Sequence, residues 1–420
     1  MPRVHFIDVT NRDGVQTSRI KMSKFQKTVI NWYLARLGVH QSEIGFPFLS
    51  HEWNYITAQM ELQRKGVFGK MALEGWCRAN VRDIEAGLRL GLRDFNISIS
   101  TSDQMIQHKF LGKLDRHAIL REMENTVLAA RNGGARTVGV NAEDASRTDL
   151  AYLIEFAQRA ASAGADRFRY CDTMGCESPH SIYERVRTLA EKSGIGVELH
   201  CHNDLGMANA NSTAGAKGAM DGGVDAYINA TVNGLGERAG QADLLSCILA
   251  FKYGSGLRQY VIGDPLDLKV AYKMAGYCFY AFGLPCPINQ PGVGENAFAH
   301  EAGIHADGAL KDRHNYELYD YEILGRGMPE SLETGRVITT GEYGGIKGFR
   351  HVCRKLGLEL PSDEKQVQGL LELTQYLNAH NQKPLLPDEI ELALKHPSEI
   401  RKILTVEPQL SCEFSAAGVA

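Results

Sequence analysis

Three observations predict an α/β protein, a (β/α)₈ TIM barrel followed by a mainly helical C-terminal region. Over about the first 235 of the 420 residues, short β-rich runs alternate with helix-like stretches. Several of these stretches end at a glycine directly before the next run, as helices commonly do. Beyond about residue 275, prolines and glycines break the alternation. Strands that alternate with helices form parallel sheets, and eight such units fit a closed barrel.

Eight runs carry the strand signal, at residues 4–10, 41–45, 71–77, 94–100, 137–142, 167–173, 197–202 and 226–232. An open, doubly wound sheet is the structural alternative. No Gly-x-Gly-x-x-Gly follows an early strand, which disfavours a dinucleotide-binding sheet. The closed barrel is therefore the preferred architecture.

The stretch 23–37 illustrates the helical signals. Ser23 and Gln26 have the spacing of a capping box at its start. Apolar residues at helical spacing form one stripe, and Gly38 ends the stretch. We therefore expect a helix that packs one face against the barrel.

The same patterns divide the chain into three segments. We expect a barrel over residues 1–275, a linker subdomain over 276–326 and a helical C-terminal subdomain over 327–420. Prolines and glycines between positions 285 and 294 mark the linker, and helical patterning returns from 361 to 404. We expect no additional regulatory domain.

The composition is that of a globular protein and argues against several classes of function. The net charge is −4, and no basic cluster of the kind that binds nucleic acid is present. No apolar run is long enough to span a membrane. Nine irregularly spaced cysteines without a Cys-x-x-Cys pair indicate free thiols in a reducing cytoplasm. Because the N-terminus leads straight into a strand, we expect no signal peptide.

Polar residues gather where two of the predicted strands end, which is where barrels carry their active sites. The first strand is followed by Arg12 and Asp13. The seventh contains His200 and His202, which share one face because strand residues alternate. Two imidazoles and a carboxylate would form a facial metal site that takes Mg²⁺, Mn²⁺ or Zn²⁺. The alternatives are structural histidines and a surface Arg–Asp ion pair.

Longer motifs around these residues resemble a known family. They are Asp8-x-Thr10-x-Arg12-Asp13-Gly14-x-Gln16, His200-Cys201-His202-Asn203-Asp204, Asn233-Gly234-x-Gly236-Glu237-Arg238-Ala239-Gly240, and the run from His300 to Gly308 followed by Tyr316-Glu317. Together they resemble the signatures of the isopropylmalate, homocitrate and Re-citrate synthases, and they occur in the family's order. The first motif is closest in wording to Re-citrate synthases. The Gly-rich third motif, taken alone, could be only a turn.

The resemblance implies an acyltransferase that condenses acetyl-CoA with a 2-oxo acid. It implies Asp13, His200 and His202 as ligands of a divalent metal, Mn²⁺ or Mg²⁺ with Zn²⁺ as the alternative. Arg12 would stabilise the developing oxyanion, and Glu43 would be a second catalytic acid. It implies further functional residues, which are Gln16 and Thr173 at the substrate and the catalytic pair His305 and Tyr316.

The pair His305 and Tyr316 belongs to the linker segment and, by the resemblance, reaches the barrel of a neighbouring subunit. We therefore expect a homodimer or a higher homo-oligomer. Deprotonation of the acetyl-CoA methyl group requires a base, and an imidazole titrates in the suitable range. His305, Tyr316 and Glu43 all remain candidates for the group that moves the first proton.

The expected substrate is a short 2-oxo dicarboxylate, with oxaloacetate favoured. Homocitrate synthases carry an arginine on the fifth strand that helps to hold 2-oxoglutarate, and here that position is Gly139. Arg78 at the end of the third strand could supply the charge closer to the metal. The alternative is that Arg78 forms a salt bridge with a carboxylate of a helix. Gln241 stands where the family often has an asparagine near the metal, and we do not expect it to be a ligand.

Other functions stay open on the sequence alone. A homocitrate or isopropylmalate synthase would use the same motifs with another 2-oxo acid. A carbon–carbon lyase of the hydroxymethylglutaryl-CoA type shares the barrel and the two histidines, but it uses a cysteine in the loop after strand eight, and none occurs between Asn233 and Arg238. The third alternative is a 2-oxo acid binding protein without catalytic activity.

Overall fold

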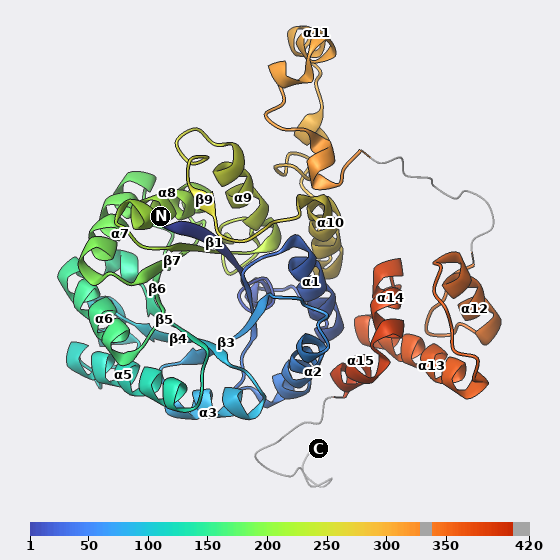
Figure 1. The fold of residues 1–420 in the computed structure, drawn as a ribbon, viewed down its shortest axis with the longest axis horizontal. Coiled ribbons are helices and arrows are strands. Elements are labelled where there is room, and N and C mark those ends of the chain that lie inside the picture. The colour runs from blue at the N-terminus through green and yellow to red at the C-terminus, as the bar shows by residue number, and fades with distance from the viewer. Residues whose placement is uncertain (328–337, 406–420) are drawn as a thin grey trace, which may run out of the picture.

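Eight parallel strands close into a barrel in the computed structural model, which describes residues 1–327 and 338–405 (Figure 1). Each strand pairs with the next in the chain, and β1 pairs with both β2 and β8, which closes the ring. The strands are β1 Arg3–Asp8, β2 Gln41–Gly45, β3 Ala72–Arg78, β4 Asp94–Ser100, β5 Thr137–Glu143, β6 Arg167–Asp172, β7 Gly196–Cys201 and β8 Ala226–Ala230. The predicted barrel is confirmed.

A ninth strand, β9 (Val261–Ile262), adds to the N-terminal end of β1. The sequence analysis missed it because two residues carry no periodic signal. Together with the segment that follows it, β9 covers the edge of the barrel beneath β1.

A ring of helices surrounds the strands (Figure 1). These helices are α1 Lys24–Leu37, α2 Trp53–Arg64, α3 Val81–Arg89, α4 Asp103–His108, α5 Arg116–Asn132, α6 Leu150–Ala163, α7 Pro179–Ser193, α8 Ala208–Asp221, α9 Leu244–Tyr253 and α10 Ala271–Phe282. Their apolar faces and the strands form one continuous core.

Helix α1 begins and ends as its sequence predicts. The Ser23 hydroxyl accepts from the Gln26 amide, and the Gln26 side chain accepts from the Ser23 amide, which completes the capping box. Gly38 has φ +88° and lies against the Pro265 carbonyl oxygen, 2.4 Å from where a Cβ would stand. Any other residue there would be strained and would collide with backbone.

Helix α10 runs across the expected boundary at residue 275. It continues to Phe282, and its residues Tyr277 and Cys278 are buried in the barrel core. Gly283 ends α10 in a left-handed conformation.

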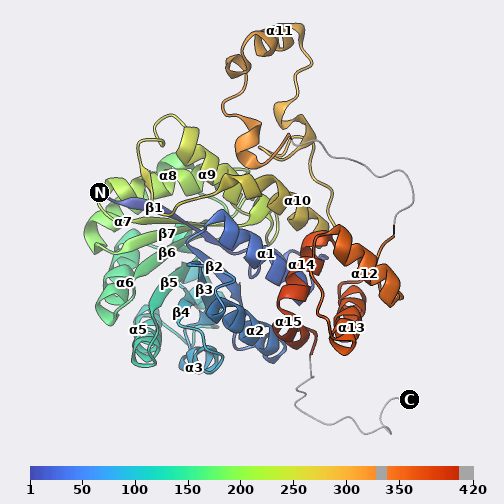
Figure 2. The same cartoon turned by 45° about the vertical axis from the view of Figure 1, so that its right-hand side comes forward.

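Beyond α10 the chain forms an arm that carries α11 (Gly303–Lys311) and stands away from the barrel in both views (Figures 1 and 2). The C-terminal region is helical as predicted, and α13 to α15 pack back against α1 and α2. Its helices are α12 Ile346–Lys355, α13 Glu364–Asn381, α14 Pro387–Lys395 and α15 Pro397–Leu404. Leu377, Ile390 and Ile400 belong to the same apolar core as the barrel.

Within residues 1–327 and 338–405, no helix is both long and apolar enough to cross a membrane. The eight cysteines in these ranges are all free thiols, as expected.

Ser23→Ala should lower the free energy of unfolding by about 2 kcal/mol, since it removes the α1 cap and also the 2.6 Å hydrogen bond from Ser23 to Asn381 of α13. Ser178→Ala, which removes the cap of α7 only, should cost about 1 kcal/mol. Urea unfolding of both variants measures the difference. Equal losses would show that the contact with α13 contributes nothing.

Candidate metal and substrate site

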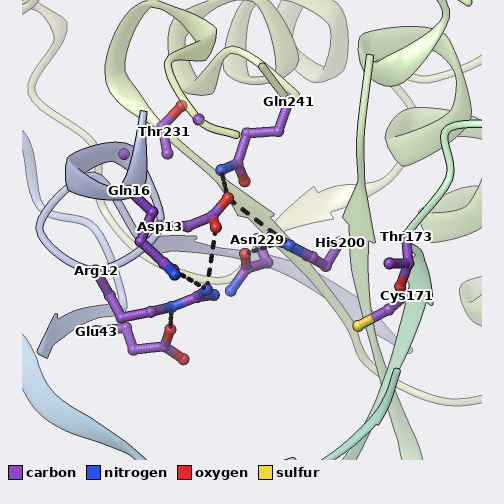
Figure 3. Close-up of polar contacts among 12 residues, drawn as sticks. Arg12, Asp13, Gln16, Glu43, Cys171, Thr173, His200, Asn229, Thr231 and Gln241 are labelled. Carbon is purple, nitrogen blue, oxygen red and sulfur yellow. Dashed lines mark hydrogen bonds and ion pairs between the residues drawn. The ribbon is translucent and has the colours of Figure 1, made fainter. Parts of the chain in front are cut away.

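The three expected metal ligands meet at the mouth of the barrel, at the C-terminal ends of the strands. Figure 3 shows two of them, Asp13 and His200, pointing toward each other. Asp13 follows β1, His200 lies in β7, and His202 follows directly after β7. All three are buried, and their ligand atoms lie within 4.8 Å of one another. His200 Nε2 is 4.0 Å from Asp13 Oδ2. The alternation of the strand thus places both imidazoles on the side that faces Asp13.

The two imidazoles are suited to bind a divalent ion. His200 Nδ1 donates to Asn229 Oδ1 at 2.7 Å, which leaves Nε2 free to ligate. Burial and the neighbouring His202 lower the pKa of His200 to about 3. Burial also lowers the pKa of His202, whose buried Nδ1 has no hydrogen-bond partner. Both side chains are therefore neutral at pH 7, which is the form that binds metal.

The carboxylate of Asp13 completes the set. Burial raises its pKa, but Arg12, His200 and His202 outweigh this effect, so the pKa is lowered and the group is ionised. The Gln241 amide donates to Asp13 Oδ2. The carbonyl oxygen of Gln241 is buried without a hydrogen-bond partner. Gln241 thus orients Asp13, and the donor set fits a divalent cation.

Arg12 lies beside the metal ligands and is held by three acceptors. Its Nε donates to Glu43, and its Nη1 lies 3.2 Å from Asp13 Oδ1 and 3.3 Å from Gln16 Oε1. Burial raises the pKa of Glu43, but Arg12 and Arg169 outweigh it and lower the pKa. Because both oxygens of Glu43 bind guanidinium groups, this carboxylate is well placed to orient Arg12 and is a poor base.

A chain of buried ion pairs runs from Arg12 into the barrel. Arg169, fully buried, donates to Glu43 Oε2 and to Glu198 Oε1, each at 2.8 Å. Glu198 also accepts from Asn229 Nδ2 at 2.7 Å, and Asn229 is the group that holds His200. Arg169 is therefore linked to the Arg12 guanidinium through Glu43. It is linked to the metal ligand His200 through Glu198 and Asn229.

The chain continues to the centre of the barrel, where Arg167 bridges Glu198 and Glu74. Gly139 faces this layer, and a Cβ there would lie 3.3 Å from Arg167 Nε. The space that a longer side chain at position 139 would need is thus occupied by Arg167. The sequence analysis did not identify these residues, although Arg167 and Arg169 gave a usable signal. Both lie in a strand among apolar neighbours, and charged side chains are rarely buried unless they are paired.

The ligands open into a cavity of about 240 Å³. Gln16 and Thr173 line it, as expected for substrate contacts. Trp76 lines it too, and its indole N–H is buried without a hydrogen-bond partner. The cavity is also lined by residues to which the sequence analysis assigned no role, namely Phe46, Trp76, Ser98, Asn141, Glu143, Cys171, Glu237 and Arg238.

Arg78, expected in the substrate pocket, does not line this cavity. Its Nε and Nη2 each donate to Asp83 of α3 at 2.8 Å, and its side chain is 57% exposed. Its guanidinium lies over the Phe48 ring, 4.3 Å from the centroid. As the last residue of β3, Arg78 is at the rim, where the carboxylate of the following helix binds it in bidentate fashion.

His305 and Tyr316 pair with each other on the arm, with ring centroids 4.4 Å apart. Both are exposed, and neither lines the cavity of its own barrel. The structure thus brings seven of the ten expected residues together at the mouth, with this pair and Arg78 elsewhere.

Comparison with known proteins agrees with this geometry. Residues 3–273 match the HMGL-like family model, and residues 293–382 match the model described as homocitrate synthase post-HMGL domain-like. The chain is 52% identical to the citrate (Re)-synthase of Dehalococcoides mccartyi, over 98% of this chain and 100% of that protein. It is 36% identical to 2-isopropylmalate synthase 2 of Caldanaerobacter subterraneus subsp. tengcongensis, over 92% and 94% of the two chains.

Among solved structures, the chain is similar to an HMG-CoA lyase of Bacillus subtilis, with a TM-score of 0.55 and 20% identity. The match covers 68% of this chain and 97% of the lyase. At this identity the likeness establishes the barrel fold alone.

Arg169→Met should lower the free energy of unfolding by about 3–5 kcal/mol, because it leaves Glu43 and Glu198 buried with too few cations. The urea midpoint, followed by circular dichroism, measures the loss. Arg187→Met removes an exposed ion pair with Glu191 and should leave the midpoint nearly unchanged. Similar midpoints for the two variants would contradict the structural importance of the buried chain.

Asn229→Ala should weaken binding of Mn²⁺ about 10–100-fold, since His200 loses the acceptor that orients its ring. Titration calorimetry of the metal-free protein measures the affinity. Asn378→Ala, at a buried asparagine of α13, is the matched control and should bind Mn²⁺ like the parent. An unchanged affinity in the Asn229 variant would rule out this orienting role.

Proposed function

The chain belongs to the HMGL-like family, and we propose that it joins acetyl-CoA to oxaloacetate with release of CoA, as a citrate (Re)-synthase does. The observation that carries the proposal is the meeting of Asp13, His200, His202 and Arg12 around one small cavity. The similarity to a citrate (Re)-synthase over nearly the whole length of both chains supports it.

Asp13, His200 and His202 would hold the divalent cation, Mn²⁺ or Mg²⁺. When bound, the cation acts as a Lewis acid on the ketone and as a template for the 2-oxo acid. Arg12 stabilises the negative charge that develops on the ketone oxygen as the carbon–carbon bond forms. Because Glu43 binds the Arg12 Nε, the guanidinium is already oriented before the charge appears.

The reaction needs a base that takes a proton from the methyl group of acetyl-CoA. The resulting enolate carbon bonds to the ketone carbon of oxaloacetate, and the ketone oxygen takes up a proton to become a hydroxyl. Water then cleaves the thioester, which releases the CoA thiol and leaves a carboxylate. Glu43 is a poor candidate for the base because both of its oxygens bind arginines.

His305, paired with Tyr316, is the base that we favour, and we propose that it acts in the barrel of a second copy. Both residues lie on the arm, and neither lines the cavity of its own barrel. Ile304 and Leu310 of α11 are 79% and 88% exposed, which is an apolar surface that a second subunit would cover. The functional unit would then be a homodimer or a larger homo-oligomer.

Neutral donors would bind the distal carboxylate of the substrate. Arg78 is bound to Asp83, whereas Trp76 lines the cavity and its buried indole N–H has no hydrogen-bond partner. Ser98 accepts from Asn141 at 3.0 Å, and its own proton is given to no side chain or carbonyl within the described ranges. A cavity of about 240 Å³ has room for a small 2-oxo dicarboxylate.

Release of the CoA thiol from acetyl-CoA tests the proposed reaction, with chelated enzyme resupplied with Mn²⁺ or Mg²⁺. Turnover should be fastest with oxaloacetate in a panel that also holds 2-oxoglutarate, 2-oxoisovalerate and pyruvate. His200→Ala should abolish it. Preference for 2-oxoglutarate or 2-oxoisovalerate would make the protein a homocitrate or isopropylmalate synthase. If no substrate of the panel gives thiol release, the proposed acyltransferase activity is wrong, and the protein is a lyase or a binding protein.

Trp76→Phe should lower kcat/KM for oxaloacetate about 10–100-fold, because it removes one N–H donor to a carboxylate and keeps the ring. Arg78→Ala should leave kcat/KM close to that of the parent, since its guanidinium is bound to Asp83 at the rim. Steady-state kinetics on both variants decide between the two residues. If Arg78→Ala lowers kcat/KM more than Trp76→Phe does, Arg78 rather than Trp76 contacts the substrate carboxylate.

A further inference from the structure

A second group of metal-ligand side chains lies at the opposite end of the barrel. His5 lies in the N-terminal half of β1, His40 directly precedes β2, and Asp264 follows β9. Their ligand atoms lie within 4.8 Å of one another. Three separate segments of the chain therefore converge on one point beneath the barrel, far along β1 from the cavity at the mouth.

Each oxygen of the Asp264 carboxylate meets one imidazole. His5 Nδ1 is 2.7 Å from Asp264 Oδ2, and His40 Nδ1 is 3.2 Å from Asp264 Oδ1. Four ligands that bind Zn²⁺ tetrahedrally at about 2.0–2.1 Å lie about 3.3 Å from one another. The two imidazole–carboxylate distances are close to this spacing, and all three ligand atoms lie within 4.8 Å of one another, so a modest adjustment would admit the ion.

The packing around His5 holds its ring in place. Tyr227 stacks on it, with ring centroids 5.1 Å apart and an interplanar angle of 20°. On Gly263, a Cβ would lie 2.1 Å from His5 Cε1, so a larger residue would displace the ring. The Gly263 amide donates to the Val4 carbonyl at 2.8 Å and fixes this segment to β1. The ligands are therefore positioned by the fold before any ion binds.

The charge of Asp264 favours a cation. A carboxylate carries a negative charge at pH 7. Within the described ranges, no lysine or arginine forms an ion pair with Asp264. A divalent cation held by the three side chains would balance this half-buried charge.

We propose that His5, His40 and Asp264 form a second, structural metal site that binds Zn²⁺ or a similar transition-metal ion. Two imidazoles and one carboxylate suit this class of ion better than Mg²⁺ or Ca²⁺, which bind mainly oxygen ligands. The ion ties β1 and the start of β2 to the segment after β9. The N-terminal face of a barrel serves stability rather than catalysis, so the inference is independent of the proposed reaction.

Zinc stoichiometry of the full chain tests the site. His200→Ala/His202→Ala removes two of the three ligands at the mouth. After equilibration with Zn²⁺ and removal of free ion, this variant should retain about one Zn²⁺ per chain by atomic emission. Addition of His40→Asn or of Asp264→Asn should abolish the retention. Asparagine at position 40 keeps an N–H donor toward Asp264 but lacks the imidazole lone pair.

Thermal unfolding gives a second readout. Zn²⁺ should raise the Tm of the His200→Ala/His202→Ala variant by about 2–4 °C and leave the variant with the added His40→Asn unchanged. The proposal is overturned if the double variant retains no zinc, or if retention is the same with and without His40→Asn. A Tm that depends on pH around the pKa of histidine but not on zinc would also overturn it and assign the group to an ion pair.

Discussion

The site depends on the buried pairing of arginine and glutamate inside the barrel. An unpaired charge in such a place costs several kcal/mol, so each of these side chains is held where its partner meets it. Arg169 is fully buried and binds Glu43 and Glu198. Through these two carboxylates it acts on Arg12 and, by way of Asn229, on His200. The barrel interior, rather than its loops, thus orients the guanidinium and a metal ligand.

The two ends of the barrel carry different kinds of polar cluster. At the mouth, metal ligands surround a cavity that is open to a substrate. At the opposite end, His5, His40 and Asp264 face one another. Strand β1 contributes to both, since Asp13 follows its C-terminal end and His5 lies near its start. The proposed functions of the two clusters, catalysis and stability, follow this arrangement.

The residues of β3 show what strand alternation predicts and what it leaves open. Strand residues alternate in direction, so Glu74, Trp76 and Arg78 share one face. The charge of Arg78, at the end of the strand, matches a substrate carboxylate, but it matches a helix carboxylate equally well. Trp76, the preceding residue on the same face, lines the cavity, and its indole N–H has no hydrogen-bond partner. Arg78 instead binds Asp83, which only the placement of α3 reveals.

The sequence by itself determined the barrel, its eight main strands, and the meeting of Asp13, His200 and His202, because these depend on local periodicity and on strand alternation. The tertiary structure alone decided the course of the Arg169 ion pairs and the pairing of Arg78 with Asp83. Side chains separated by many residues find their partners only when the strands have closed into a ring. No local sequence pattern predicts which carboxylate pairs with a given guanidinium.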